Sequence, residues 1–310
     1  MSAVPSTIDG SAAPLTILLL GKNGQLGWEL QRALAPLGTV IALDRHSSPH
    51  CGDLADPAGL ARTVAELRPG VIVNAAAYTA VDKAESDVAM ARTVNAEAPA
   101  ALARAAQQIG AWLISYSTDY VFDGSGQRPW REDDLTAPLN VYGATKLEGE
   151  QAIVAHCERH LIFRTSWVYA ARGGNFAKTM LRLAGERDRM AVIDDQIGAP
   201  TGADLLADLT AHAIRSARRA PKLAGIYHVA AAGETSWHDY ARHVVARARA
   251  SGVELRVSDA AIEAVKTTAF PTPATRPHNS RLDTTKLRNA FGLTMPRWQV
   301  GVDRMLTEIL

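Results

Sequence analysis

Short apolar runs alternate with segments of helical periodicity from residue 15 onward. The apolar runs predict buried strands at LTILLL (15–20), TVIALD (39–44), GVIVNAAA (70–77), AWLISYSTDYVF (111–122), which runs into a loop, and HLIFRTSWVY (160–169). Amphipathic segments lie between them, such as WELQRALAPLG, which Pro36 and Gly38 end. Because strands that alternate with helices are typical of a parallel sheet covered on both faces, the pattern predicts a doubly wound α/β fold.

The alternation weakens after residue 170. One more helix–strand pair, DLLADLTAHAIRSA and GIYHVA (225–230), is expected to return to the sheet. Residues 171–200 and 231–310 contain more loops, prolines and isolated helices. We therefore expect a main domain made of residues 15–170 with about 201–230, and a smaller C-terminal lobe made of residues 171–200 with 231–310. Residues 1–14 are expected to be a mobile extension.

The segment LLLGKNGQLGWEL places Gly21, Gly24 and Gly27 directly after the first strand and at the start of a helix. In this context Gly21 permits a tight turn, Gly24 lets the backbone approach a pyrophosphate, and Gly27 lets the helix pack closely on the strand. A glycine-rich turn without a ligand is the alternative, but the flanking strand and helix favour dinucleotide binding. The sequence therefore predicts a Rossmann-type dinucleotide-binding domain, with the C-terminal lobe left to bind the substrate.

The second predicted strand ends at the position of the adenosine ribose. It ends in Asp44, whose carboxylate can accept hydrogen bonds from both ribose hydroxyls, as NAD binding requires. Arg45 follows and can instead bind the 2′-phosphate of NADP, so the sequence supports both cofactors. Asp53 and Leu54 can lie beside the adenine, and the small residues 75–77 can admit the cofactor.

Residues suited to acid–base chemistry gather at the carboxyl end of the fourth strand. Ser117, Thr118 and Asp119 stand at that end, and NVYGATKLEGE (140–150) places Tyr142 and Lys146 one turn apart on the next helix. Hydride addition to a ketone builds negative charge on oxygen, which Tyr142 can protonate. The ammonium group of Lys146 is expected to lower the phenol pKa from its ordinary value of about 10. Thr118 can donate a second hydrogen bond to the same oxygen.

Composition and charge exclude several classes of partner. The formal net charge of +1 favours neither nucleic acid nor an anionic membrane. No apolar run approaches the roughly 18 residues that cross a bilayer, and residues 1–14 lack the cationic and apolar blocks of a secretion signal. Cys51 and Cys157 cannot form a disulfide framework, which fits a reducing compartment. His46, His50, Cys51 and Asp53 match no common zinc spacing. A cytoplasmic enzyme is expected.

Six segments together resemble the extended short-chain dehydrogenase/reductases: GKNGQLGWEL, STDYVF, NVYGATKLEGE, FRTSWVY, DQIGAPTG and RPHNSRLDTTK. The resemblance runs from about residue 15 to the C-terminus. It implies reduction, with NADPH or NADH, of the 4-keto group of dTDP-4-dehydro-β-L-rhamnose to dTDP-β-L-rhamnose, an activated sugar for surface polysaccharides such as O-antigen. It also implies that Thr118, Tyr142 and Lys146 form the catalytic trio, with Lys146 holding the nicotinamide ribose.

The same resemblance implies further site residues. The cofactor contacts would be Gly24, Gln25, Leu26, Asp44, Asp53, Leu54, Ala77, Tyr78 and Thr79, and the substrate contacts Asp119 and Trp167. The aromatic face of Trp167 suits the apolar side of a deoxysugar, although plain core packing is an equal alternative. Some family members bind magnesium through acidic residues at the interface of a homodimer. The matching positions are Glu29, Asp204 and Asp208. The alternative is that these carboxylates are simply solvated and bind no metal.

Two other functions remain open. A nucleotide-sugar dehydratase or epimerase of the same superfamily is the nearer one, but a dehydratase needs Thr-Asp-Glu at the strand end, and here Tyr120 follows Asp119. The other is a non-catalytic dinucleotide-binding subunit that regulates a partner enzyme, similar to the regulatory subunit of methionine adenosyltransferase. The intact catalytic trio disfavours it. Arg276 and Arg281, in RPHNSRLDTTK, can bind a diphosphate or be solvated.

Overall fold

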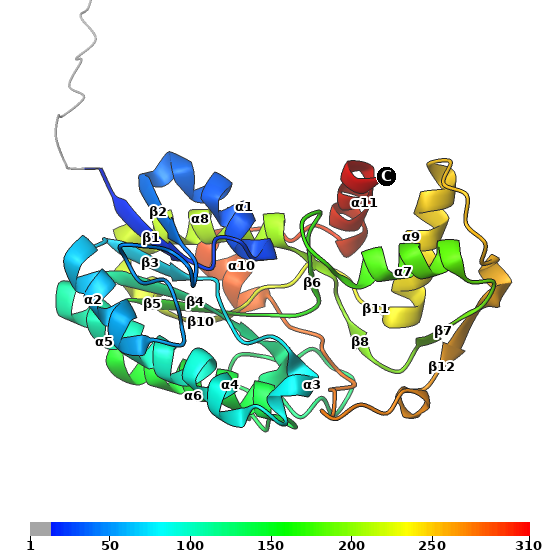
Figure 1. Cartoon of the computed structure of the whole chain (residues 1–310), viewed down its shortest axis with the longest axis horizontal. Coiled ribbons are helices and arrows are strands. Elements are labelled where there is room, and N and C mark those ends of the chain that lie inside the picture. The colour runs from blue at the N-terminus through cyan, green and yellow to red at the C-terminus, as the bar shows by residue number, and fades with distance from the viewer. Residues whose placement is uncertain (1–13) are drawn as a thin grey trace, which may run out of the picture.

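The computed structural model describes residues 14–310 and shows a parallel sheet between two layers of helices, with a smaller lobe beside it (Figure 1). The sheet has six parallel strands in the order β10-β5-β4-β3-β1-β2. Their bounds are β1 Thr16–Leu20, β2 Thr39–Leu43, β3 Val71–Asn74, β4 Trp112–Thr118, β5 His160–Thr165 and β10 Gly225–His228. The predicted doubly wound α/β fold is confirmed.

The sheet buries apolar side chains on both faces, because successive residues of a strand point to opposite sides. In β1, Ile17 and Leu19 pack under α1 (Gln25–Leu34) and α8 (Ala203–Arg219). Leu18 and Leu20 pack under α2 (Pro57–Leu67), α5 (Ala98–Ile109) and α6 (Val141–His156), which cover the other face (Figure 1). Each such side chain contributes about 1.5–3 kcal/mol by its burial. This two-sided burial explains why the strands appear as continuous apolar runs in the sequence.

The strand order places a ligand crevice near the glycine turn. From β1 the chain winds one way to β2 and the other way through β3, β4 and β5, so the direction reverses between β1 and β3. Ligands of open α/β sheets bind beyond the carboxyl ends of the strands at this reversal. Beyond β3 the chain forms α3 (Val81–Ala84), α4 (Val88–Arg92) and a π-helical turn (Thr93–Glu97) that leads into α5.

The lobe is built from short strand pairs and three helices, α7 (Phe176–Glu186), α9 (Trp237–Ala250) and α11 (Trp298–Ile309) (Figure 1). The pairs are β7 (Met190–Ile193) with β12 (Ile262–Val265) and β8 (Ile197–Gly198) with β11 (Thr235–Ser236). A further pair, β6 (Val168–Tyr169) with β9 (Thr201–Gly202), comes from residues expected in the main domain and contacts α11. The core of the lobe lies around Tyr240, Trp298 and Val302 on one side and Met180, Val192 and Val245 on the other.

One predicted strand is divided in the structure. HLIFRTSWVY was expected to be continuous, but β5 ends at Thr165 and Val168–Tyr169 pair with β9 outside the main sheet. Trp167 between them has φ 49°, in the left-handed region, so the chain turns there. The apolar run hid the break because its residues are buried in two different sheets.

We propose the domain division given above, residues 15–170 with about 201–230 against residues 171–200 with 231–310. One helix of the proposed lobe, α10 (Thr285–Phe291), packs on β10, and its Leu287 and Phe291 belong to the core of the sheet. The expected extension at residues 1–14 lies outside the described residues except for Pro14. Between residues 14 and 310, no helix combines the length and the apolar character needed to cross a membrane.

Candidate active site

The turn between β1 and α1 has no room for a side chain at two of its glycines, Gly21 and Gly27. Gly21 has φ 88°, and a Cβ there would lie 2.9 Å from the amide nitrogen of Ala76 at the end of β3. A Cβ on Gly27 would lie 2.0 Å from the carbonyl oxygen of Gly21. Gly24 closes the turn by donating its N–H to the same carbonyl (3.0 Å) and is the N-cap of α1. The free N–H groups at the start of α1 thus follow a close-packed turn. This arrangement suits the binding of a pyrophosphate.

Gln25 and Leu26 follow the turn as the first residues of α1. The Gln25 Oε1 atom is buried and has no hydrogen-bond partner among residues 14–310, so it can accept a hydrogen bond from a ligand. These features, together with the absence of room for side chains at Gly21 and Gly27, show that the residues present fit a bound dinucleotide.

Asp44 stands at the carboxyl end of β2 as an ionised carboxylate. It accepts hydrogen bonds from the His46 amide (2.9 Å) and the Asn23 side chain (2.5 Å), and Lys22 Nζ lies 3.8 Å away. The hydrogen bond from His46 is the main cause that lowers the pKa of Asp44. Arg45 beside it is exposed. A 2′-phosphate could reach Arg45 directly, whereas a ribose would have to compete with Asn23 and Lys22 for the Asp44 carboxylate, so both cofactor roles stay predictions.

The other expected cofactor contacts line the same end of the sheet in different ways. Asp53 accepts the Ala55 amide (3.0 Å), and the Leu54 side chain is buried in the core, so it offers a ligand mainly its backbone. Ala77 is half-buried and Thr79 is exposed. Tyr78 is anchored by its amide to the Asn95 side chain (2.9 Å) and by its hydroxyl to Asp87 (3.0 Å).

The structure brings Thr118, Tyr142 and Lys146 together. Thr118 is the last residue of β4, while Tyr142 lies in the first turn of α6, which begins where the side chain of Asn140 accepts the Gly143 amide (2.8 Å). The Thr118 hydroxyl lies near enough to the Tyr142 phenol to influence its pKa. Lys146 is buried one turn later and donates from Nζ to the carbonyl oxygen of Tyr116 in β4 (2.6 Å).

Burial dominates the protonation of these groups. It raises the pKa of Tyr142 to about 12, with the nearby Thr118 hydroxyl acting in the opposite direction. It lowers the pKa of Lys146 to about 8, against the opposing charge of Glu150. The expectation that Lys146 lowers the pKa of Tyr142 is therefore wrong for this structure, because the ammonium is directed at the backbone of β4. At neutral pH the phenol carries its proton and can donate it.

A buried ion pair that the sequence interpretation missed lies behind Lys146. Glu150, one further turn along α6, binds Arg164 of β5 through Nε–Oε1 (2.9 Å) and Nη2–Oε2 (2.7 Å), and both side chains are less than 5% exposed. Arg164 neighbours Ser117 in the sheet. Glu150 was visible in NVYGATKLEGE, but nothing in the sequence indicated its partner.

Asp119 and Ser280 form a second contact that only the folded chain reveals. Asp119 is buried and accepts the Thr118 hydroxyl (3.2 Å), and the nearby Ser280 side chain opposes the rise of its pKa. Burial raises its pKa to about 7, and its Oδ2 atom has no partner among the described residues. Ser280 belongs to RPHNSRLDTTK, whose motif was recognised without a role for this residue.

Trp167 reaches the same place from the end of β5. A Cβ on Gly198 would lie 2.8 Å from the Trp167 ring and 3.1 Å from Ser280 Cβ, so the indole lies close to Ser280. Its ring also stacks on that of Trp237. The Ser280 side chain thus lies near both the Trp167 ring and the Asp119 carboxyl group.

Three other expectations concern charged residues that are paired in the structure. Arg276 binds Asp82 (2.7 Å) and Arg281 binds Glu234 (2.6 Å), so a diphosphate would have to compete with these carboxylates. The acidic residues matched to magnesium all form ion pairs with arginine. Glu29 (3.5 Å) and Asp208 (2.9 Å) both pair with Arg32, and Asp204 pairs with Arg304 (3.5 Å). Within residues 14–310 no three His, Cys, Asp or Glu side chains gather as a metal site.

Comparison with known proteins agrees with this geometry. The family model described as RmlD substrate binding domain matches residues 15–310. A curated dTDP-4-dehydrorhamnose reductase from Shigella flexneri is 62% identical over 295 residues, which cover 95% of this chain and 98% of the relative. Solved dTDP-4-dehydrorhamnose reductases from Clostridium acetobutylicum and, in complex with NADP, from Bacillus anthracis are each 35% identical, cover 95% of this chain and 99% of their own, and have TM-scores of 0.85 and 0.84.

The match to the family extends over both the glycine turn and the lobe that carries Trp237 and Ser280. Similarity of this extent and level cannot come from the dinucleotide-binding fold alone, because that fold is shared by enzymes of many activities. The chain therefore belongs to the dTDP-4-dehydrorhamnose reductase family.

Proposed function

We propose that this chain reduces the 4-keto group of dTDP-4-dehydro-β-L-rhamnose with NADPH or NADH and forms dTDP-β-L-rhamnose. The observation that carries the proposal is the convergence of Thr118, Tyr142 and Lys146 at the carboxyl end of β4. The glycine turn that fits a dinucleotide follows β1 in the same sheet. The activity named for the Shigella flexneri relative supports the choice of sugar.

Each member of the trio has a distinct task at the carbonyl group. When bound, the reduced nicotinamide supplies a hydride to the carbonyl carbon. Tyr142 donates its phenolic proton to the carbonyl oxygen, and its raised pKa of about 12 keeps that proton in place until charge develops there. Thr118 donates a second hydrogen bond to the same oxygen and thereby stabilises the negative charge.

Lys146 holds the positive charge of the site. Its ammonium, which donates to the Tyr116 carbonyl oxygen in this structure, can hydrogen-bond the nicotinamide ribose. With a pKa of about 8, it is charged at neutral pH. Glu150 and Arg164 behind it form a compensated pair, so Lys146 does not face an unpaired buried guanidinium.

Asp119 and Trp167 are proposed to bind the sugar. The Oδ2 atom of Asp119 has no partner among residues 14–310 and can accept a sugar hydroxyl. The Trp167 ring can cover the apolar face of a deoxysugar. On the cofactor side, the glycine turn, Asp44 and Arg45 are proposed to hold the pyrophosphate, the ribose and the 2′-phosphate.

The decisive experiment supplies the purified chain with dTDP-4-dehydro-β-L-rhamnose and NADPH, or NADH, and follows the loss of absorbance of the reduced nicotinamide. We expect oxidation of cofactor with formation of dTDP-β-L-rhamnose in equal amounts. Omission of the sugar is the control. Tight NADPH binding without any oxidation would contradict the proposal and favour a non-catalytic dinucleotide-binding subunit.

We further propose that the enzyme is a cytoplasmic homodimer that binds magnesium through Glu29, Asp204 and Asp208. Support is limited to the position of these carboxylates on α1 and α8, which pack together. Sedimentation with magnesium and with a chelator tests the assembly, and Asp208→Asn tests the site. A sedimentation coefficient that is the same with magnesium, with chelator and in Asp208→Asn would contradict the proposed metal site.

A further inference from the structure

Trp167 occupies a strained backbone conformation. Its φ of 49° lies in the left-handed region, which is unfavourable for a residue with a side chain. Among residues 14–310 that are not glycine, only Arg68 at the C-cap of α2 shares a positive φ. Such a conformation persists only where surrounding contacts compensate for it, and it is often found at ligand sites. The neighbours of the Trp167 ring therefore decide where the indole lies.

One face of the indole is covered by a second tryptophan. The rings of Trp167 and Trp237 are stacked with centroids 3.6 Å apart and planes 15° apart. Trp237 donates its Nε1–H to Gln196 Oε1 (3.1 Å), and the buried Gln196 side chain donates from Nε2 to Thr267 Oγ1 (3.2 Å). The outer edge of Trp237 is thus fixed by a buried amide, which in turn fixes the ring behind Trp167.

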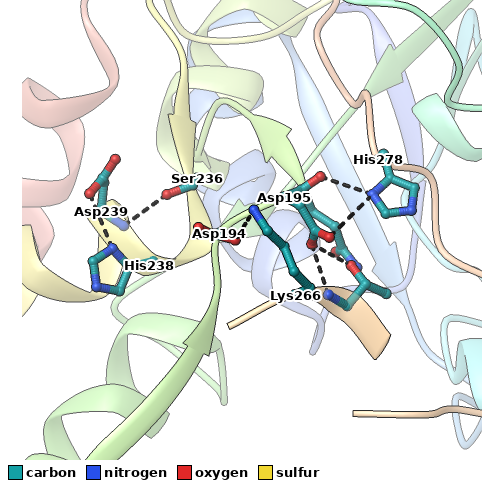
Figure 2. A network of polar contacts seen from close by, with 9 residues as sticks. Asp194, Asp195, Ser236, His238, Asp239, Lys266 and His278 are labelled. Atoms are coloured by element: carbon teal, nitrogen blue, oxygen red, sulfur yellow. Dashed lines mark hydrogen bonds and ion pairs between the residues drawn. The ribbon is translucent and has the colours of Figure 1, made fainter. Parts of the chain in front are cut away.

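Polar contacts hold the backbone on either side of the Trp237–Gln196 hydrogen bond: one set lies at the start of α9, and another lies around Asp194 and Asp195 (Figure 2). Trp237 begins α9 directly after the N-cap Ser236, whose hydroxyl accepts the Asp239 amide (3.0 Å). Asp195, next to Gln196, accepts the amide (2.9 Å) and the hydroxyl (2.6 Å) of Thr267.

Two further contacts reinforce this tie (Figure 2). Lys266 binds Asp194 (3.0 Å), and the His278 ring bonds the Asp195 carbonyl oxygen (2.9 Å). The loop with Gln196 and the segment 266–278 therefore form one support behind the two indoles.

The Trp167 ring also packs against Gly198 and lies close to Ser280. Gly198 leaves room for the ring, since a Cβ there would lie 2.8 Å from its Cε2 atom. Ser280 Cβ lies close to the same point, and the Ser280 side chain lies near the Asp119 carboxyl group, which accepts from Thr118. A sugar bound at Thr118 would therefore lie within reach of the indole.

We propose that Trp237 and Gln196 are positioning residues that fix the Trp167 indole as the platform for the apolar face of a 6-deoxy-4-keto sugar. The inference rests on the proposed function, in which Trp167 contacts the sugar. Neither Trp237 nor Gln196 touches the reacting atoms. Their contribution is to hold a strained, partly exposed ring in the one place where it can discriminate a deoxygenated sugar from a fully hydroxylated one.

The main test replaces Trp237 with Leu and measures steady-state kinetics with the dTDP-sugar and NADPH. We expect the KM for the sugar to rise about tenfold, because the stacked partner of Trp167 is lost. The kcat should change less than about twofold, since a platform binds ground state and transition state alike. The KM for NADPH should stay unchanged. Trp237→Phe, which keeps an aromatic face, should recover most of the affinity for the sugar.

Trp298→Leu is the matched control. Trp298 is buried in the same lobe core and packs edge-on against Tyr240, with no stacking on Trp167. It should lower stability to a similar extent without changing the KM for the sugar. An equal rise in KM for Trp237→Leu and Trp298→Leu would overturn the inference, because general loosening of the lobe would then explain both. No rise for Trp237→Leu would overturn it as well.

A spectroscopic measurement tests the geometry without catalysis. Two indoles stacked this closely give an exciton-coupled circular dichroism signal, which Trp237→Leu and Trp167→Leu should both abolish and Trp298→Leu should retain. Gln196→Met should weaken the signal and raise the KM for the sugar by a smaller factor than Trp237→Leu. A coupled signal that survives Trp237→Leu would refute the stacked arrangement.

The two proposals fail in different ways. If the unaltered chain does not oxidise NADPH with the sugar, the proposed function fails while the circular dichroism test of the stacking still stands. If the unaltered chain is active but Trp237→Leu leaves the KM for the sugar unchanged, only the positioning role fails.

Discussion

The cofactor end and the sugar end of the candidate site are built in different ways. The cofactor end is centred on one short turn, Gly21–Gly27, in which Gly21 and Gly27 have no room for a Cβ atom, and Asp44 and Arg45 follow the neighbouring strand β2. The sugar end is assembled from the ends of β4 and β5, the Gln196–Gly198 loop, the start of α9 and Ser280, and it depends on side-chain contacts. A site made of backbone keeps one ligand, whereas a site made of side chains can change its substrate without changing the fold.

The electrostatics of the two ends differ in the same sense. At the cofactor end Asp44 is partly exposed, and hydrogen bonds lower its pKa, so it is a permanent anion. At the catalytic end burial raises the pKa of Asp119 to about 7 and lowers that of Lys146 to about 8. The carboxylate of Asp44 thus keeps its charge in contact with solvent, whereas burial brings the pKa values of Asp119 and Lys146 close to neutral pH.

The comparison predicts that the two ends can be broken separately, and the largest effect is expected at the catalytic end. Tyr142→Phe removes the proton donor but keeps the ring that packs edge-on against Tyr120. We expect kcat to fall by about 10² to 10⁴, with the affinity for NADPH nearly unchanged. Single-turnover oxidation of NADPH and a fluorescence titration measure the two quantities. A variant that keeps most of its turnover would show that Tyr142 is not the donor.

The next effect should appear at the cofactor end alone. Gly27→Ala places a Cβ 2.0 Å from the Gly21 carbonyl oxygen, so the helix must move away from the turn. We expect NADPH to bind at least about tenfold more weakly, as calorimetry can measure. Gly185→Ala in α7, where a Cβ would have no atom within 4 Å, is the control and should bind NADPH normally. Equal affinity of Gly27→Ala and the unaltered chain would remove the turn from the cofactor site.

The pH dependence should report on the catalytic end. Burial lowers the pKa of Lys146 from 10.5 to about 8, so Lys146 loses its positive charge as the pH rises through about 8. Because the proposed mechanism needs that charge, kcat should fall above this pH by up to about tenfold per unit. Tyr142, with a raised pKa of about 12, keeps its proton over the same range. A rate that stays constant up to the ordinary lysine pKa of about 10.4 would contradict this role.

The smallest effect should distinguish the two cofactors. Arg45 is exposed, so its interaction with a 2′-phosphate is weakened by solvent. We expect Arg45→Ala to weaken NADPH by about threefold to fivefold and to leave NADH unchanged, as judged by KM for each cofactor. Arg68→Ala, at the far end of α2, is a control for the loss of one positive charge. Equal weakening of NADPH and NADH would remove Arg45 from the ribose site.

The sequence alone was sufficient for much of this protein. The strands β1, β3 and β4 are recognisable as apolar runs because they are buried on both faces. The glycine spacing after β1 identified the turn because the steric restriction at Gly21 and Gly27 comes from residues nearby in the chain. Tyr142 and Lys146 share a helix, so their proximity follows from helical periodicity. Helical periodicity also placed Glu150 on that face, but it could not show that Arg164 is its partner.

Only the tertiary structure decided the rest. The break between β5 and β6, the contact of Ser280 with Asp119 and the stacking of Trp237 on Trp167 join segments that are far apart in the chain. No local pattern encodes such contacts, because many side chains could occupy each partner position. The direction of the Tyr142 pKa shift was likewise set by burial, which depends on how the whole chain packs around the phenol. The sequence thus determined the fold, the glycine turn after β1 and the position of Tyr142 and Lys146 on one helical face, while packing determined the pKa values of the buried groups and the surroundings of Trp167.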